Sequence, residues 1–340
     1  MNFLVLMKWD FDISIIEFFN KLTENSFLEL LFKGITFLGT ETAIMIVLCL
    51  LYWCFDKEIS KKVAIATFFS LLLTNSVKSM FNRLRPFQMS PDTIECRDKS
   101  ILSKDLNGNY YKITGETGEY LASSSSSFPS GHSTTASSFY NSFAYQLKKK
   151  RYWIISTILC LLVMISRMSL GVHFLTDVLV GYFIGLGLIS LYFFLKKKTN
   201  ESMIVEIIFI SIFGILTFIS PIYSDNPKDL FSVFGSTLGF VLGSYLESKH
   251  VNFRYTKSIW KNILRFIIGF VLLLGIRYAL KLTYSWAFEE GTYLCSICDM
   301  IRYFAMVFVG IYVYPLLFKK LKFLNDKVEN ESNWNYWKNI

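Results

Sequence analysis

The stretch VLVGYFIGLGLISLYFFL, residues 178–195, carries no charged side chain. A helix of about 20 predominantly apolar residues is needed to cross the hydrocarbon core of a bilayer, and this stretch with its flanks approaches that length. Similar runs, almost free of charge, occur at residues 43–55, 154–165 and 263–274. Because the backbone polar groups of a spanning segment must be satisfied internally in lipid, helices are the expected spanning elements. The sequence therefore predicts an all-α, multi-pass transmembrane helical bundle.

The composition agrees with a membrane-embedded chain. Of the 340 residues, 53% are hydrophobic and 18% are charged, whereas a soluble domain has about 25% charged residues. The mean hydropathy is +0.40. We expect about nine spans of this kind, near residues 35–55, 62–82, 132–147, 152–170, 176–195, 203–222, 229–247, 262–281 and 299–318.

We expect four regions along the chain. Residues 1–34 are expected to form interfacial amphipathic N-terminal helices, with a poorly hydrophobic first span as the alternative. Residues 35–198 are expected to form a core of five to six helices, residues 199–322 a C-terminal extension of further transmembrane helices, and residues 323–340 a polar tail. The core contains a long polar loop, residues 87–131, and a loop of this length is usually functional or disordered. Within it, Asn107-Gly108 predicts the turn of a small hairpin.

The net charge of +9 is gathered in clusters near the expected helix ends. These clusters fall in every second inter-helix loop, which is the distribution that the positive-inside rule gives to cytoplasmic loops. The charge is therefore explained by topology in a cell membrane, and it does not indicate nucleic-acid binding. The same topology places the loop of residues 87–131 on the non-cytoplasmic side.

Three polar segments fall at non-cytoplasmic helix ends, where ionisable groups are costly and tend to be functional. The first is KSMFNRLRP, residues 78–86. Lys78 and Arg85 are seven residues apart, so both are expected on one face of a helix that Pro86 ends. A pair of cations that snorkel from a helix end is the alternative interpretation.

The second segment is PSGH, residues 129–132, which follows a run of serines. Ser130 and Gly131 are expected to open a helix, and the free N–H groups and positive dipole end of such a helix bind anions. A simple helix N-cap by Ser130 is the alternative. It leaves His132, one of only three histidines in the chain, without an explanation.

The third segment is SRMSLGVHFLTD, residues 166–177. His173 and Asp177 are four residues apart, so a helix that starts near His173 places the carboxylate beside the imidazole. Such a carboxylate fixes the tautomer and leaves the other ring nitrogen available as a nucleophile. A structural Asp–His pair is the alternative. Arg167 adds a third cation to the same membrane face.

The three segments together indicate a pocket for a multiply charged anion. Three fixed cations suit phosphate or pyrophosphate, and two histidines allow one to attack while the other protonates the leaving oxygen. In order and internal spacing, the segments resemble the three motifs of the type 2 phosphatidic acid phosphatase superfamily, which includes glucose-6-phosphatase and the vanadium haloperoxidases. The resemblance covers about residues 35–195.

The resemblance implies a role for each matching residue. His173 attacks phosphorus and forms a phosphohistidine, Asp177 orients it, and His132 protonates the leaving group and then activates water. The phosphoryl oxygens are held by Lys78, Arg85, Ser130, Gly131 and Arg167. The resemblance also implies that the enzyme uses no metal ion and no cofactor.

The membrane location favours a lipid phosphate or diphosphate at the outer leaflet as substrate. Undecaprenyl diphosphate, phosphatidate and phosphatidylglycerophosphate are the leading candidates, and a sphingoid-base phosphate is a further one. A non-catalytic lipid-binding or lipid-translocating protein with the same anion pocket is the alternative from another class. A haloperoxidase with bound vanadate is disfavoured by the membrane embedding. The sequence does not predict the oligomeric state.

The expected extension has its own polar residues. Arg277, Asp299 and Arg302 are expected to form either an intramembrane ion pair or a wall of a lipid-binding groove or a second headgroup contact. Cys295 and Cys298 allow a disulfide, but a lone pair at this spacing is weak evidence for a metal site.

Glycines spaced by four residues predict close contacts between helices, because they let a neighbouring backbone approach. They occur at Gly181 and Gly185 and at Gly235, Gly239 and Gly243.

Overall fold

The computed structural model describes residues 10–81, 83–103, 110, 112–115, 118–121, 123, 125–222, 227–256, 258–288 and 292–320. They form two compact units, each assembled from separate parts of the chain. The first unit takes the described residues of Met1–Ala43 and Leu73–Ser190, and the second takes those of Ile44–Leu72 and Leu191–Ile340. The chain passes between the units after Ala43 and again within the helices α4 (Lys57–Met80) and α8 (Leu175–Lys198).

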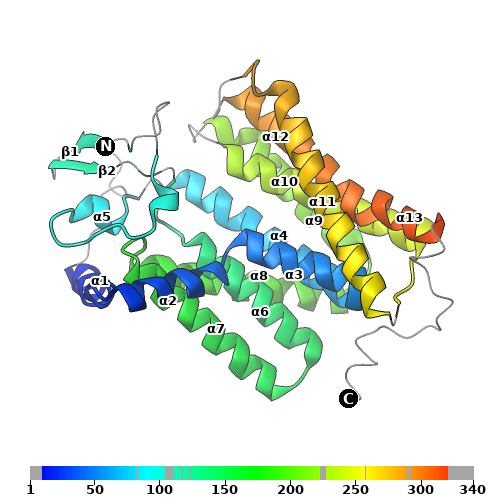
Figure 1. The fold of residues 1–340 in the computed structure, drawn as a ribbon, viewed down its shortest axis with the longest axis horizontal. Coiled ribbons are helices and arrows are strands. Elements are labelled where there is room, and N and C mark those ends of the chain that lie inside the picture. Colours follow the sequence, from blue (N-terminus) through cyan, green and yellow to red (C-terminus); the bar gives the residue numbers. More distant parts are fainter. Residues whose placement is uncertain are drawn as a thin grey trace. The chain divides into compact units, whose positions relative to one another are not determined.

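The first unit contains the three polar segments. Besides parts of α4 and α8, its elements are α1 (Asp10–Leu22), α2 (Ser26–Phe37), α5 (Pro86–Met89), the 3-10 turn η3 (Lys99–Ile101), β1 (Lys112–Gly115), β2 (Gly118–Leu121), α6 (Gly131–Leu147) and α7 (Lys150–Ser169). Figure 1 shows α6 and α7 side by side as a helical hairpin. The hairpin turns at Lys148, whose φ of 53° is left-handed.

A small antiparallel hairpin lies in the long polar loop, as expected. β1 pairs with β2 from Lys112 opposite Leu121 to Gly115 opposite Gly118. The Asn107-Gly108 pair lies outside the described residues.

The second unit contains the extension. Its elements, besides parts of α4 and α8, are α3 (Glu41–Leu50, most of which belongs here), η2 (Leu51–Phe55), α9 (Ile204–Ile219), η4 (Ser220–Ile222), α10 (Lys228–Leu246), η5 (Glu247–Val251), α11 (Ile259–Tyr284), α12 (Tyr293–Phe308), η6 (Val309–Val313) and α13 (Tyr314–Lys320). Of these, η2, η5 and η6 are π-helical and η4 is a 3-10 turn.

The predicted glycine contacts are confirmed within each unit. A Cβ added at Gly235 would meet the carbonyl oxygen of Met300, so α10 and α12 approach each other at backbone distance. In the first unit, a Cβ added at Gly181 would meet the carbonyl oxygen of Ser130, and one at Gly185 would lie 2.8 Å from the carbonyl oxygen of Thr134. The glycines of α8 thus seat the first turns of α6.

The sequence predicts about nine spans, and the described residues contain seven candidates, or up to eight. Within the described ranges, seven helices are long and apolar enough to cross a membrane, and the pair Ser26–Phe37 and Glu41–Phe55, bent by 51°, allows an eighth. They are Lys57–Met80, Lys150–Ser169, Leu175–Lys198, Ile204–Ile222, Lys228–Val251, Ile259–Tyr284 and Tyr293–Phe318. The segment predicted as a span at residues 132–147 forms α6, which is only 17 residues long and buries a row of hydroxyl and amide side chains. It packs side by side with the candidate span α7.

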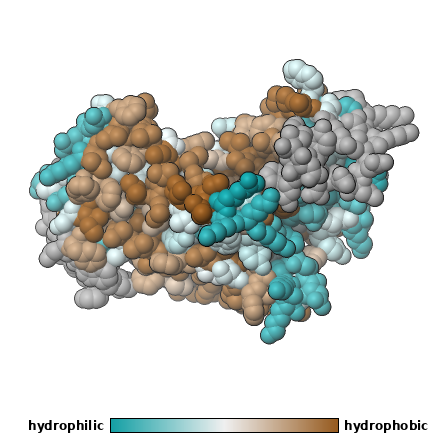
Figure 2. Space-filling view, turned by 90° about the horizontal axis from the view of Figure 1, so that it is seen from below, coloured by the Kyte–Doolittle hydropathy of each residue, from teal (hydrophilic) through white to brown (hydrophobic). Residues whose placement is uncertain are grey.

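Apolar side chains remain exposed on the candidate spans, as lipid-facing surfaces require. On α9, one face presents isoleucines that are about half exposed or more, at Ile204, Ile207, Ile208, Ile212 and Ile215. Figure 2 shows apolar side chains over much of the visible face. The all-α transmembrane architecture with a C-terminal extension is therefore confirmed, with the two-stranded hairpin as an addition.

Candidate active site

Ser130 begins α6 as its N-cap. Its backbone is extended (φ −72°, ψ 112°), and its Oγ accepts hydrogen bonds from the N–H and Oγ of Ser133 at 3.5 and 3.1 Å. The Ser130 N–H donates to the carbonyl oxygen of Asp177 at 3.1 Å, which ties this cap to α8. A Cβ added at Gly131 would have open space around it. The helix N-terminus predicted from PSGH is therefore present and unobstructed at Gly131.

The prediction that Lys78 and Arg85 share one helix face is wrong. α4 ends at Met80, and Arg85 has an extended backbone (φ −83°, ψ 159°) as the N-cap of α5. The residue before a proline disfavours the helical region, because the proline ring clashes with its backbone, and Pro86 follows Arg85. Lys78 nevertheless acts electrostatically on both His132 and His173. The two cations reach the site from a helix and from the irregular segment after it.

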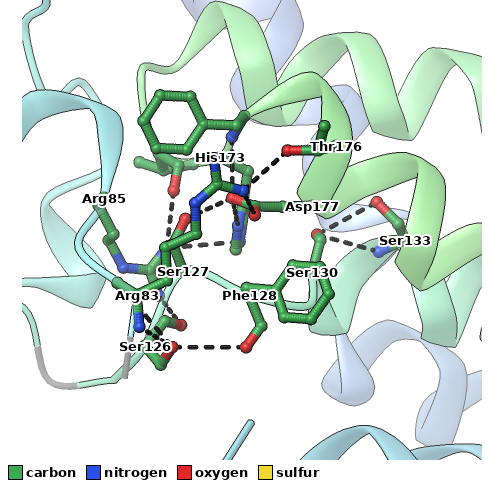
Figure 3. Close-up of polar contacts among 12 residues, drawn as sticks. Arg83, Arg85, Ser126, Ser127, Phe128, Ser130, Ser133, His173, Thr176 and Asp177 are labelled. Atoms are coloured by element: carbon green, nitrogen blue, oxygen red, sulfur yellow. Dashed lines mark hydrogen bonds and ion pairs between the residues drawn. The ribbon is translucent and has the colours of Figure 1, made fainter. Parts of the chain in front are cut away.

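The guanidinium of Arg85 is held by serines of the run that precedes PSGH. Its Nε donates to Ser123 Oγ at 2.7 Å and to the carbonyl oxygen of Ser125 at 3.2 Å, and its Nη2 donates to Ser125 Oγ at 3.0 Å. Its Nη1 donates to the carbonyl oxygen of Val172 at 2.9 Å and lies 3.3 Å from Nε2 of His173 (Figure 3). These serines therefore orient the arginine next to the imidazole.

His173 lies in the turn between α7 and α8, beside Asp177 as predicted. The distance from His173 Nδ1 to Asp177 Oδ2 is 3.6 Å, which is longer than a hydrogen bond, and Nδ1 has no hydrogen-bond partner among the described residues. The same oxygen accepts hydrogen bonds from Ser127 Oγ at 2.5 Å and from the Phe174 N–H at 2.9 Å. Both His173 and Asp177 are buried. The imidazole is thus placed between a carboxylate and the guanidinium of Arg85.

The electrostatic surroundings keep His173 neutral. Burial lowers the pKa of His173 well below its usual value of 6.5, because a charged ring is poorly solvated there. The positive charges of Arg85, Arg167 and Lys78 lower this pKa further. A neutral imidazole has a free electron pair on one nitrogen, which is the form that nucleophilic attack requires.

Arg83 is a member of the site that the sequence analysis did not single out. Its Nη1 donates to Asp177 Oδ1 at 2.6 Å and to Thr176 Oγ1 at 2.8 Å, and its Nη2 lies 3.4 Å from Asp12 Oδ2. Its guanidinium also lies 4.3 Å from the ring centre of Phe174. Figure 3 shows the contact between Arg83 and Asp177. The only sequence signal was a second arginine inside KSMFNRLRP, two residues before Arg85.

Arg167 is placed near His132 and is paired with an aspartate from the long polar loop. Its Nη1 donates to Asp98 Oδ2 at 2.8 Å and to Thr36 Oγ1 at 3.0 Å. Arg167 and Asp98 both act electrostatically on His132, which is half-buried in the first turn of α6. The structure thus brings the predicted residues of all three segments together. It adds Arg83, Asp98, Asp12 and Ser127.

The polar residues of the extension form an ion pair, one of the two arrangements considered from the sequence. Arg302 Nη2 lies 2.5 Å from Asp299 Oδ1, which also accepts a hydrogen bond from Tyr284. Arg277 is exposed. Cys295 and Cys298 are not joined by a disulfide. In the part of the chain that the structure describes, no three His, Cys, Asp or Glu side chains are grouped so that they could hold a metal ion.

Two family models match the chain. The model of the PAP2 superfamily matches residues 60–201, which contain all three polar segments. The model described as PAP2 superfamily phosphatase, transmembrane extension, matches residues 231–327. The chain therefore belongs to the PAP2 superfamily, and the resemblance drawn from the three motifs is confirmed. It is a multi-span membrane protein of a phosphatase family.

Individual relatives match this chain over part of its length. Phosphatidylglycerophosphatase B of Bacillus subtilis (strain 168) is 39% identical over 112 residues, which cover 30% of this chain and 53% of that protein. The chain thus spans about half the length of this curated relative. The crystal structure of Aquifex aeolicus LpxE has 24% identity and a TM-score of 0.40 over 55% of this chain and 97% of its own. The crystal structure of the first transmembrane PAP2 type phosphatidylglycerolphosphate phosphatase from Bacillus subtilis has 30% identity and a TM-score of 0.40 over 56% and 84%.

Proposed function

We propose that this protein is an integral membrane lipid phosphatase that acts through a phosphohistidine intermediate. The observation that carries the proposal is the position of His173, whose Nε2 lies 3.3 Å from Arg85 and whose Nδ1 lies 3.6 Å from Asp177. A nucleophile oriented on one side by a carboxylate and flanked on the other by a phosphate-binding cation suits attack on a phosphoryl group.

The roles divide between the two histidines and the cations. His173 Nε2 attacks phosphorus and breaks the bond to the lipid oxygen, and His132 donates the proton that this oxygen takes up. His132 then removes a proton from water, which attacks the phosphohistidine and releases inorganic phosphate. The transition-state charge is stabilised by Lys78, Arg85, Arg167, Ser130 and the Gly131 N–H. Because these groups supply the electrostatic stabilisation, the proposed reaction needs no metal ion and no cofactor.

The proposed substrates are phosphate or diphosphate lipids. Phosphatidylglycerophosphate is supported by the name of the Bacillus relative, while phosphatidate and undecaprenyl diphosphate are supported by the membrane location alone. We place the reaction at the outer leaflet of the plasma membrane, because the basic clusters fall in the loops opposite the three motifs. Residues 35–198 carry the chemistry in this proposal, and residues 199–322 extend the bundle. We further propose that residues 1–34 lie at the interface and that residues 323–340 form a polar tail.

A lipid panel tests the proposed function. Purified protein in detergent, with EDTA present, is incubated with phosphatidate, phosphatidylglycerophosphate, undecaprenyl diphosphate and a sphingoid-base phosphate, and released phosphate is measured. We expect release from at least one lipid by the wild type and by His250→Ala, and none by His173→Ala. His250 is a matched control, because it is the third histidine and is exposed in the second unit. Tight lipid binding without phosphate release would instead favour a lipid-binding or translocating protein.

A further inference from the structure

The segment of residues 94–102, in the long polar loop, is anchored directly beside the site. The N–H of Arg97 donates to the carbonyl oxygen of Leu170 at 3.1 Å. Asn20 accepts from the N–H of Glu95 and donates to its carbonyl oxygen, both at 3.0 Å. Gly171 has a φ of +72°, and a Cβ there would collide with the same Glu95 carbonyl. The segment is therefore fixed against the turn that leads to His173.

Asp98 uses its two carboxylate oxygens for different partners. Oδ1 accepts hydrogen bonds from the N–H and Oγ of Ser100 at 3.2 and 2.6 Å, which holds the side chain in the loop. Oδ2 accepts from Arg167 Nη1 at 2.8 Å. Burial raises the pKa of Asp98, but the charge of Arg167 and the Ser100 hydrogen bonds outweigh burial and lower it to about 2. The carboxylate is therefore ionised at neutral pH.

The contacts of Arg167 are concentrated on one nitrogen. Nη1 binds both Asp98 and Thr36, whereas Nε is buried and has no hydrogen-bond partner among the described residues. Arginine binds phosphate best through two adjacent N–H groups. The anchoring at Nη1 therefore fixes the guanidinium and leaves its Nε side for an anion.

Asp98 also changes the charge of the site. Its carboxylate places a fixed negative charge against Arg167, one of the three cations predicted to bind phosphate. Arg83 pairs with both Asp177 and Asp12, so it adds no positive charge to the site. A phosphate monoester carries roughly −1.5 to −2 at neutral pH, and a diphosphate carries more. The negative charge of Asp98 therefore disfavours the diphosphate more than the monoester.

We propose that Asp98 is a positioning residue that fixes Arg167 for the phosphoryl group and makes the site favour phosphate monoesters over diphosphates. The proposal rests on the proposed phosphatase function and deepens it. It also gives the long loop a role, which none of the three motifs explains. A carboxylate that merely competed with phosphate for Arg167 would inhibit the enzyme, so its removal would raise activity. If the carboxylate were merely structural, its removal would lower the activity on all substrates alike.

The test compares phosphatidate with diacylglycerol diphosphate, which has the same lipid chains and one more phosphoryl group. kcat and KM are measured for the wild type, Asp98→Asn, Asp98→Glu and Glu95→Gln. Glu95 is the matched control, because it lies in the same segment, its side chain is 63% exposed, and it pairs with Arg97 at 2.8 Å. Melting temperature and elution in detergent show whether each variant is folded.

We expect Asp98→Asn to lower kcat/KM for phosphatidate by about 10- to 100-fold, the range typical for losing a charged hydrogen bond. The loss for the diphosphate is expected to be clearly smaller, so the ratio of the two rates moves toward the diphosphate. Asp98→Glu should restore part of the preference, and Glu95→Gln should resemble the wild type.

Equal losses on both lipids, an unchanged ratio, or a gain in activity on both lipids would overturn the role of Asp98. If Asp98→Asn fails to fold, Ser100→Ala must move the ratio in the same direction, because it removes a hydrogen bond that orients the carboxylate. A wild type that releases phosphate from neither lipid would contradict the proposed function itself. The two failures are therefore distinguishable.

Discussion

Arg83 and Asp177, 94 residues apart in the sequence, form a buried ion pair with 2.6 Å between Nη1 and Oδ1. Through Asp177 this pair borders His173, and through Nη2 of Arg83 it extends to Asp12 at the start of α1. The carboxylate expected to orient the nucleophile is thus itself oriented by a cation from the segment KSMFNRLRP. The N-terminal helix takes part in the same network, because Asp12 also accepts a hydrogen bond from Thr176 Oγ1 at 2.8 Å.

Replacing Arg83 should damage both stability and activity. In Arg83→Gln the buried Asp177 loses its counter-ion, and breaking a buried ion pair on one side costs roughly 3–5 kcal/mol. We expect a lower melting temperature and phosphate release reduced well beyond the loss of folded protein. Arg97→Gln is the matched control, because Arg97 pairs with Glu95 and lies 3.6 Å from Glu29 without touching Asp177. Equal effects of the two replacements would contradict a specific role for Arg83.

A methyl group at Gly181 should disturb the N-terminus of α6. Its Cβ would meet the carbonyl oxygen of Ser130 and lie 3.2 Å from Ser133, so Gly181→Ala forces α6 and α8 apart beside His132. Overpacking of this kind costs about 1–3 kcal/mol. We expect a lower melting temperature and slower phosphate release. Gly187→Ala on the same helix has open space around its Cβ and should leave both unchanged; a comparable loss there would show that the effect is not due to this contact.

The rate of phosphoenzyme formation should stay high at mildly acidic pH. The neutral form of His173 attacks, and its pKa lies well below 6.5 because of burial and the charges of Arg85 and Arg167. As pH falls, protonation removes the nucleophile only below that lowered pKa, whereas the proposed acid His132 must be protonated before it donates, so a falling pH assists it. Rapid-quench measurements across pH should place the midpoint of the acid limb below 6.5. A midpoint at or above this value would contradict the electrostatic account.

Chelators should not reduce activity. The phosphoryl charge is held in the proposal by Lys78, Arg85 and Arg167, and no step is assigned to a metal ion. We expect the same kcat before and after dialysis against EDTA. Vanadate should inhibit, because it mimics the five-coordinate phosphoryl group that these cations bind. An activity lost on chelation and restored by one divalent cation would point to a metal-dependent phosphatase.

Much of the site could be predicted because its signals are local. The four-residue spacing of His173 and Asp177 and the capping by Ser130 depend on neighbours within one or two helical turns. The prediction that the helix of Lys78 continues to Arg85 is wrong for a local reason as well, because α4 ends at Met80, before Pro86.

The supporting residues could not be predicted because their partners are remote. Asp98 meets Arg167 across 69 positions and Arg83 meets Asp12 across 71, and neither pair has a spacing pattern. The polar interior of α6 has a related cause. Its hydroxyl side chains are buried against neighbouring helices that only the fold brings together.

Trapping of the covalent intermediate would show directly whether His173 is the nucleophile. Wild-type protein is mixed with lipid carrying a radiolabelled phosphoryl group, quenched during turnover in alkali, digested and sequenced by mass spectrometry. We predict an acid-labile, alkali-stable phosphate on the peptide that contains His173, retained in His250→Ala and absent in His173→Ala. Label on any other residue, or full phosphate release by His173→Ala, would contradict it.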